Sequence, residues 1–129
     1  MSIIKNWRNC LPTVAHRVGV DWRLLSMIGS KTDGDIEAEV DPKYQCMQTI
    51  TYLSLAWLQP SLTYESHQHL DHEEVYYIIK GTGQITINNQ TENFRDGDAI
   101  YIPPKCFHSI TNTGDEMVEF IAFGGHVLI

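Results

Sequence analysis

Residues 67–81, HQHLDHEEVYYIIKG, hold the densest group of metal-ligating side chains in the sequence. The first eight of them include three histidines and three acids, and a hydrophobic run follows directly. Side chains two residues apart on a strand project from the same face, so His67 and His69 are predicted to point the same way. Such a pair can chelate a divalent metal, and Glu74 is close enough after a short loop to add an oxygen ligand. The stretch therefore predicts a metal site at the mouth of a buried strand.

A further candidate ligand, His108, lies in the stretch 97–112, GDAIYIPPKCFHSITN, just after a Pro-Pro corner. Tyr76 follows Glu74 by two positions and is expected to share its inward face, either as a core tyrosine or as an acid or base. His72, between the ligands, is either a solvated loop histidine or a proton shuttle at the rim of a pocket. Tyr76 and His72 are therefore the candidate catalytic residues.

The chain around these candidates is rich in β-branched and aromatic runs that alternate with turn signals. The predicted strands are residues 20–29, 46–58, 74–80, 84–87, 91–94, 99–103, 107–112 and 117–125. The turn at 88–90, Asn-Asn-Gln, predicts a hairpin because asparagine tolerates the positive φ of tight turns. Residues 30–44 are polar and contain Asp-Gly and Asp-Pro, which predicts a loop. Short strands with regular turns and no long helix indicate an antiparallel all-β sandwich or barrel.

Size and composition exclude several classes of function. The 129 residues predict a single domain, 1–129, with N-terminal strands and loops in 1–45 and the barrel in 46–125. A net charge of −7 disfavours nucleic acid, and no apolar run approaches the roughly 18 residues that span a bilayer. The three scattered cysteines fit neither a disulfide framework nor a thiolate zinc site. Without the pattern of a signal peptide at its start, the chain is expected to be cytoplasmic.

Together, the stretches 67–81 and 97–112 resemble the two sequence motifs of the cupin superfamily. The first motif is HxH, four residues, Glu, six residues, Gly; the second is Gly, five residues, Pro, four residues, His, three residues, Asn. The matching positions are His67, His69, Glu74 and Gly81, followed by Gly97, Pro103, His108 and Asn112. One position departs from the pattern, because Lys105 stands where the second motif usually has glycine, and this leaves the local turn conformation open.

The resemblance implies an all-β cupin jelly roll, a double-stranded β-helix barrel, with one divalent metal ion at its mouth. The implied ligands are His67, His69, Glu74 and His108, and such a set suits iron, manganese, nickel, cobalt or zinc. An octahedral ion held by these groups keeps two positions open for a small, anionic substrate. The leading interpretation is an Fe(II)-dependent dioxygenase-like oxidoreductase. Two alternatives stay open: a non-oxidative lyase, isomerase or decarboxylase, and a metabolite- or sugar-binding module without turnover.

Several side chains near the motifs have roles that the sequence leaves open. Along 46–58, either the even-numbered side chains, such as Tyr52, or the odd-numbered ones, such as Trp57, line the cavity. Cys106 precedes His108 by two positions and is expected to face inward as a buried thiol. The cations that could pair with a substrate carboxylate are Arg23, Lys80 and Lys105.

The remaining expectations concern the surface and the oligomeric state. His16 and His126 are predicted to be surface or interface residues. The apolar segments 1–7 and 22–29 are expected to pair two copies of the chain, because an exposed sheet edge would otherwise promote aggregation. We therefore expect a homodimer.

Overall fold

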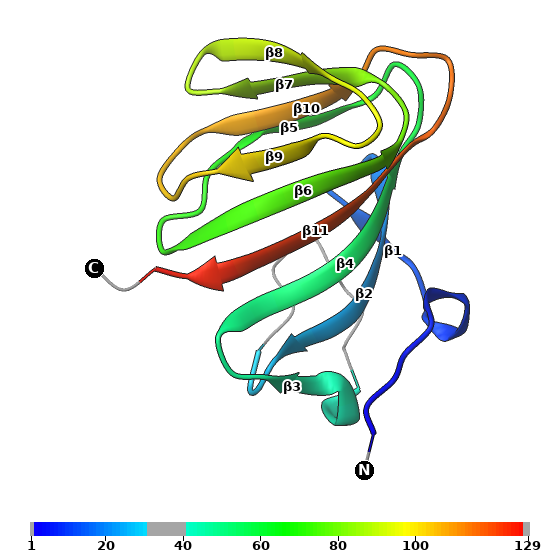
Figure 1. The fold of residues 1–129 in the computed structure, drawn as a ribbon, viewed down its shortest axis with the longest axis vertical. Helices are drawn as coiled ribbons and strands as arrows, with labels where there is room; N and C mark the ends of the chain where they lie inside the picture. The colour runs from blue at the N-terminus through cyan, green and yellow to red at the C-terminus, as the bar shows by residue number, and fades with distance from the viewer. Residues whose placement is uncertain (1, 31–40, 128–129) are drawn as a thin grey trace.

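Two sheets of short strands enclose one hydrophobic core in the computed structural model, which describes residues 2–30 and 41–127 (Figure 1). The larger sheet has seven strands in the order β1-β2-β4-β11-β6-β9, with β3 beside β2. The smaller sheet has four strands in the order β5-β10-β7-β8. Within the described residues, β2 and β3 pair in parallel and the other pairs are antiparallel. The prediction of an all-β fold is confirmed.

The strands are three to nine residues long, and two short 3-10 helices accompany them. The elements are η1 Trp7–Asn9, β1 Thr13–Ala15, β2 Gly19–Met27, η2 Pro42–Tyr44, β3 Gln45–Met47, β4 Ile50–Leu58, β5 Thr63–His67, β6 His72–Lys80, β7 Gly83–Ile87, β8 Gln90–Phe94, β9 Ala99–Ile102, β10 His108–Asn112 and β11 Val118–His126. Between residues 2–30 and 41–127, no helix has the length and apolar character that spanning a bilayer requires.

The core lies on the inner faces of both sheets and follows the period-two alternation of their strands. On β6, Glu74, Tyr76 and Ile78 are buried while Tyr77 and Ile79 are exposed. Burying a large apolar side chain such as Ile78 stabilises the fold by roughly 1.5–3 kcal/mol. The alternation thus places the acidic residue of the first motif inside the barrel.

The open question about the strand after residue 45 is settled in favour of the even-numbered side chains. Tyr52 and Ala56 of β4 line an internal cavity. On the opposite face of the sheet, Trp57 packs against Trp22 and Trp7, with ring centroids 4.6 and 6.0 Å away. The indole cluster covers the outer face of β2 and β4, so the cavity lies on their other face.

Several predicted boundaries differ from the structure. The predicted strand 46–58 is divided into β3 and β4, and the polar strand β5, with the sequence TYESH, had no prediction. The sequence of β5 shows almost no hydrophobic alternation, because Tyr64 is its only apolar, fully buried residue. The hairpin at 88–90 is confirmed by the positive φ values of Asn88 and Asn89. Of the loop predicted for 30–44, residues 31–40 lie outside the described residues, and Pro42–Tyr44 form η2.

Lys105 has a left-handed backbone conformation, with a φ of 65°. The turn therefore forms without a glycine, and the Lys105 amide donates to the carbonyl oxygen of His69 at 2.7 Å. A side chain in this conformation costs roughly 1–2 kcal/mol, which the greater unfolded-state freedom of glycine partly offsets. We expect Lys105→Gly to raise the free energy of unfolding by about 0.5–1 kcal/mol, measured by urea denaturation.

Gly97 provides the matched control for this substitution. Its φ is +88°, and a methyl group added there would meet no atom within 4 Å, so only backbone strain distinguishes alanine from glycine. We expect Gly97→Ala to lower the free energy of unfolding by about 1 kcal/mol. A destabilised Lys105→Gly variant would contradict the assignment of strain to Lys105.

Candidate metal centre

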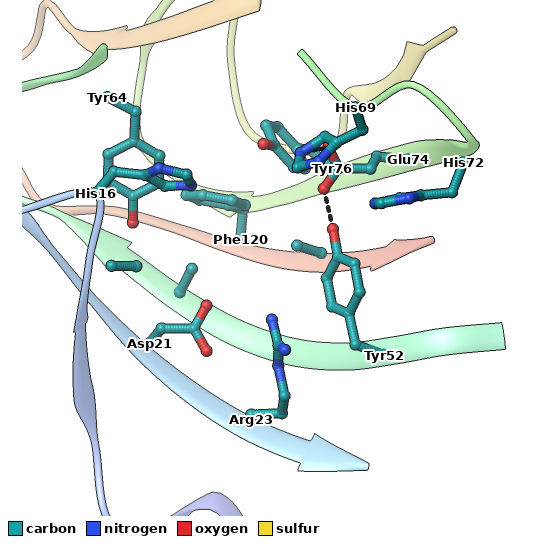
Figure 2. Close-up of a pocket in the computed structure, with 13 residues that line it drawn as sticks. His16, Asp21, Arg23, Tyr52, Tyr64, His69, His72, Glu74, Tyr76 and Phe120 are labelled. Carbon is teal, nitrogen blue, oxygen red and sulfur yellow. Dashed lines mark hydrogen bonds and ion pairs between the residues drawn. The ribbon is translucent and has the colours of Figure 1, made fainter. Parts of the chain in front are cut away.

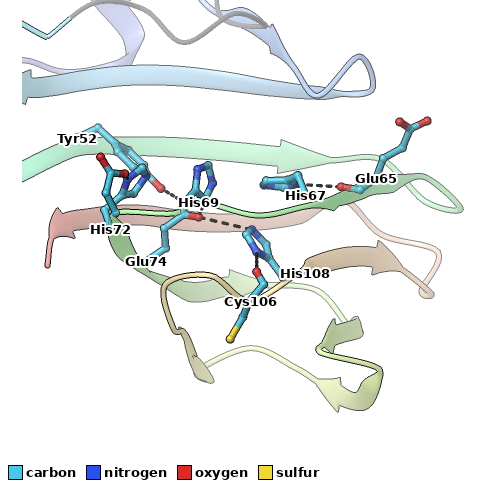
Figure 3. Close-up of polar contacts among 9 residues, drawn as sticks. Tyr52, Glu65, His67, His69, His72, Glu74, Cys106 and His108 are labelled. Atoms are coloured by element: carbon cyan, nitrogen blue, oxygen red, sulfur yellow. Dashed lines mark hydrogen bonds and ion pairs between the residues drawn. The ribbon is translucent and has the colours of Figure 1, made fainter. Parts of the chain in front are cut away.

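Four side chains of the two motifs converge inside the barrel (Figure 3). His67 ends β5 and is the register partner of His108, which begins β10, while Glu74 extends from β6. Each of these residues and His69 offers one ligand atom, and the four atoms lie within 4.8 Å of one another. The structure thus brings together the four ligands that the resemblance implied.

The position of His69 differs from the prediction that it shares a strand face with His67. β5 ends at His67, and His69 lies in the connection to β6. The hydrogen bond from Lys105 to the His69 carbonyl ties this connection to the turn before β10. The main-chain contact, and not strand alternation, therefore turns the His69 ring toward Glu74, where Nε2 lies 2.9 Å from Oε1.

Neighbouring groups orient the ligands. His67 Nδ1 donates to the Glu65 carbonyl at 2.8 Å, and His108 Nδ1 donates to the Cys106 carbonyl at 3.2 Å. A carbonyl oxygen can only accept, so these bonds assign the proton to Nδ1 and the lone pair to Nε2. The Tyr52 hydroxyl donates to Glu74 Oε2, which leaves Oε1 facing the histidines. Both imidazoles and the carboxylate thus present an electron pair to the shared space.

The donor set fits a divalent transition metal. Glu74 Oε1 and His108 Nε2 are buried and 3.5 Å apart; beyond the ion-pair contacts of Oε1 with His69 and His108, neither atom has a hydrogen-bond partner within the described chain. Buried polar atoms normally have such partners, and an ion between them would satisfy both. Imidazole and carboxylate together suit iron, manganese, nickel, cobalt or zinc. We conclude that the residues of this site fit the metal that the motifs imply.

The protonation states of Glu74 and His108 also suit a metal ion. Burial by itself would raise the pKa of Glu74, but contact with His69 and the hydrogen bond from Tyr52 lower this pKa to about 2. Burial, reinforced by the positive charge that a protonated His67 would carry, lowers the pKa of His108 to about 4. At neutral pH the site therefore holds a carboxylate and a neutral imidazole, the forms that bind metals.

The metal-free protein is expected to lose stability in acid. The pKa of His108 falls from 6.5 to about 4 on folding, so below pH 6.5 the unfolded chain binds the extra proton. The free energy of unfolding therefore has its full value above pH 6.5 and falls by about 2–3 kcal/mol as the pH is lowered to 4. Glu74, with a pKa lowered to about 2, adds a loss in the same direction at still lower pH. Urea denaturation across this range measures the effect.

His108→Gln is the control for the acid response. Glutamine does not titrate, so the variant is expected to lack most of the decline between pH 6.5 and 4. An equal decline in the wild type and the variant would show that another group is responsible.

A cavity of about 250 Å³ opens beside the ligands (Figure 2). His69 and Glu74 form part of its wall. The candidate catalytic residues His72 and Tyr76 also line it, as does Arg23 from β2. Of the three candidate cations, therefore, Arg23 faces the cavity; Lys80 and Lys105 are exposed and do not line it.

Two neighbouring side chains lie differently from the predictions. Cys106 points away from the ligands, and its sulfur accepts from Asn88 Nδ2 at 3.1 Å (Figure 3). Cys106 lies in the connection between β9 and β10, before the strand begins at His108, so strand alternation does not set the direction of its side chain. His16, predicted to be a surface or interface residue, is half-buried; its ring stacks on His67 with a centroid distance of 4.2 Å and lines the cavity.

His72 belongs to a second group of polar residues at the mouth of the barrel. Its Nδ1 lies 2.9 Å from Asp71 Oδ1, and His126 Nδ1 lies 3.9 Å from the other oxygen of Asp71. His126 is half-exposed, in agreement with its predicted surface position. The His72 ring is also 4.5 Å from the His69 ring, so it connects this group with the metal ligands.

Sequence reasoning missed Asp21 as a part of the site and left Tyr52 as one of two alternatives. Both come from strands that precede the first motif, β4 and β2, and both line the cavity. No spacing within the motifs refers to them, because their position depends on the pairing of β2 with β4 and of β4 with β11. Inward parity on β4 would have been the signal for Tyr52.

Comparisons with known proteins identify the family of the chain. A family model described as "Cupin domain" matches residues 55–124. An oxalate-binding protein of Thermotoga maritima is 34% identical over 101 residues, which cover 78% of this chain and 82% of that protein. An uncharacterized protein of Methanocaldococcus jannaschii is 47% identical over 55 residues, 43% of this chain and 44% of that one. The chain thus spans less than half the length of this second relative.

A solved structure has a similar fold. The crystal structure of a predicted oxalate decarboxylase from Thermotoga maritima matches with a TM-score of 0.75 and 22% sequence identity. The match covers 96% of this chain and 99% of the other. At this level of identity, the likeness concerns the arrangement of the strands.

Proposed function

Because the chain belongs to the cupin family and has the jelly-roll fold, we propose that it holds one divalent metal ion with His67, His69, Glu74 and His108 and converts a small carboxylic acid beside it. The observation that carries this proposal is the convergence of four ligand atoms within 4.8 Å at the wall of a cavity of about 250 Å³. Such a volume suits a ligand of a few heavy atoms. When bound, the metal supplies a Lewis acid that polarises a carboxylate or carbonyl oxygen.

Arg23 is the residue proposed to pair with the substrate carboxylate. Its guanidinium group lies over the Tyr52 ring, 4.7 Å from the centroid, and its Nε donates to Ser54 Oγ at 3.4 Å. These contacts hold a planar, permanently charged group at the cavity wall, and a guanidinium can donate two bonds to one carboxylate. The oxalate-binding protein among the relatives supports a small carboxylate as the ligand.

His72 and Tyr76 are proposed to serve the reaction as proton-carrying groups. With Nδ1 of His72 bonded to Asp71, its Nε2 is left to take or give a proton at the rim of the cavity. Burial and the charge of Glu74 raise the pKa of Tyr76 well above its ordinary value, so this phenol stays protonated and would be able to donate a hydrogen bond to a ligand. His72 would move the proton, and Tyr76 would orient the reacting group.

The reaction that these groups support best is a non-oxidative one, such as decarboxylation or lyase chemistry. Proton-carrying side chains line the cavity, and such reactions need a proton at the carbon that loses its substituent. An Fe(II)-dependent dioxygenase is the second candidate. It is favoured by the three-histidine, one-glutamate set and by the apolar wall of Ala56, Phe120 and Ala122, which suits dioxygen.

Turnover measurements on the protein loaded separately with iron, manganese, nickel, cobalt and zinc test this proposal. Small mono- and dicarboxylic acids are supplied, while product, carbon dioxide and dissolved oxygen are followed together. Product without net oxygen consumption supports the non-oxidative reaction, and stoichiometric oxygen consumption supports the dioxygenase. Calorimetric binding without any turnover would instead indicate a binding module, and absence of both would overturn the proposal.

We also propose that the chain pairs as a homodimer through its N-terminal region. β1 lies at the edge of the larger sheet, and the nearby side chains Ile4, Leu11 and Val14 are exposed. An exposed apolar sheet edge favours pairing with another chain. Light scattering at micromolar concentration tests this, with Val14→Glu as the disrupting variant; a monomeric wild type would contradict it.

A further inference from the structure

Two buried polar atoms in the cavity wall have no role in the metal site. They are Oδ1 of Asp21, on β2, and the hydroxyl of Tyr64, on β5 (Figure 2). The two residues are 7% and 3% exposed, and neither atom has a hydrogen-bond partner within the described part of the chain. Leaving buried polar atoms unpaired costs free energy, so each such atom requires an explanation.

The two atoms belong to one place in the cavity. Gly19 and Asp21 are two residues apart on β2 and share a face, with roughly 7 Å between their Cα atoms. The Tyr64 hydroxyl rests directly on Gly19, where a methyl group would collide with it. The Tyr64 hydroxyl therefore lies beside the position from which the Asp21 carboxylate extends. The charge of Asp21 also helps to raise the pKa of Tyr64, although burial is the larger cause.

The Asp21 carboxylate is held in place by its neighbours. Its other oxygen is hydrogen-bonded to Ser54, whose hydroxyl accepts from Arg23 Nε at 3.4 Å. Ser54 is fully buried, so this chain of bonds is shielded from water. Fixing one carboxylate oxygen in this way directs the second one, Oδ1, as a preformed acceptor in the cavity wall.

Ring contacts connect this place with the metal ligands. The Tyr64 ring lies 5.0 Å from that of His16, which stacks on His67 at 4.2 Å. One side chain, His16, thus lies between the Tyr64 ring and His67. A ligand that reaches from the metal ligands to Asp21 and Tyr64 needs a backbone of only a few carbon atoms.

The chemistry of the two atoms defines their complement. A carboxylate oxygen accepts a hydrogen bond, and a phenol can donate one. An alcohol can donate to Asp21 and accept from Tyr64 at the same time, whereas an ammonium group would leave the phenol hydrogen of Tyr64 unpaired and a second carboxylate could not donate to Asp21. A hydroxyl group therefore satisfies both atoms.

We propose that Asp21 and Tyr64 form a subsite for an alcohol group, and that the substrate is a small hydroxylated carboxylic acid with its carboxylate at the metal end of the cavity. This inference rests on the proposed function for the metal end only. It goes further by assigning the opposite end of the substrate. The subsite would select against acids of equal length that end in a methyl group.

Calorimetry with the zinc-loaded protein tests the subsite with two matched probes, 2,4-dihydroxybutyrate and 2-hydroxybutyrate. The two acids share the metal-binding end and differ in one distal hydroxyl. We expect the dihydroxy acid to bind at least about tenfold more tightly to the wild type, and this preference to disappear in Tyr64→Phe and in Asp21→Ala. Tyr101→Phe, whose hydroxyl bonds to Glu73 outside the cavity, is the control and should keep the preference.

Thermal unfolding of the ligand-free variants separates binding from a structural role. Removing an unpaired buried hydroxyl in Tyr64→Phe is expected to leave the Tm unchanged or to raise it, whereas loss of a structural bond would lower it. Equal binding of the two acids to the wild type, or a preference unchanged in both variants, overturns the subsite alone. If neither acid binds the metal-loaded protein, the proposed function fails and the subsite with it.

Discussion

Replacing Glu74 with glutamine is expected to weaken metal binding by at least about 100-fold. Glutamine keeps the shape of the side chain but removes the only carboxylate among the four ligands, and even changes to residues that merely orient a ligand cost about 10- to 100-fold. The Tyr52 hydroxyl also loses the carboxylate to which it donates. Competition with a chromophoric chelator measures the affinity for zinc and manganese.

Glu73→Gln is the matched control for this change. Glu73 is adjacent in sequence, but its side chain points to the opposite face of β6, where it accepts from the Tyr101 hydroxyl at 2.8 Å. We expect the metal affinity of this variant to equal that of the wild type. Similar affinities for Glu74→Gln and wild type would remove Glu74 from the ligand set.

The largest expected effect on stability comes from Asn112, the last residue of the second motif. Its Nδ2 donates to the Leu58 carbonyl at 2.9 Å and to the Glu116 carbonyl at 2.7 Å, while its Oδ1 accepts from the Gly114 amide at 3.0 Å. The side chain is fully buried, so Asn112→Ala leaves three main-chain groups without these partners. We expect a loss of about 3–5 kcal/mol in the free energy of unfolding, measured by urea denaturation.

Asn93→Ala provides the comparison for Asn112→Ala. Asn93 lies on the edge strand β8, is exposed, and accepts one hydrogen bond from Gln84. Its removal is expected to change the stability by less than about 0.5 kcal/mol. Metal content in the folded fraction of Asn112→Ala should match the wild type, since Asn112 contacts other parts of the chain than the ligands. A loss of metal without a loss of stability would contradict this structural role.

The candidate metal ligands were predictable from the sequence because their spacing is local to two short motifs. His67, His69, Glu74 and His108 converge as the resemblance implied, although His69 reaches its position through a main-chain bond to Lys105. The strands that carry the motifs were also predictable, since turn residues mark their ends. Strand β5 was missed because its exposed face is polar, which leaves little hydrophobic alternation to detect.

The wall of the cavity opposite the motifs was not predictable. Asp21, Arg23 and Tyr52 come from β2 and β4, and their side chains reach the cavity through strand pairings between distant parts of the sequence. A shift of one residue in either register would turn these side chains to the outer face. Because such registers depend on tertiary packing, the sequence left both parities of β4 open.

Metal content per chain, measured by mass spectrometry, tests the central claim most directly. The proteins compared are the wild type, His108→Ala and His126→Ala; His126 belongs to a separate group with Asp71 and His72, so its replacement tests whether the metal is held there instead. We predict about one equivalent of metal in the wild type and in His126→Ala, and none in His108→Ala. Absence of metal from the wild type after loading, or retention of the full equivalent in His108→Ala, would contradict the assignment of the metal centre.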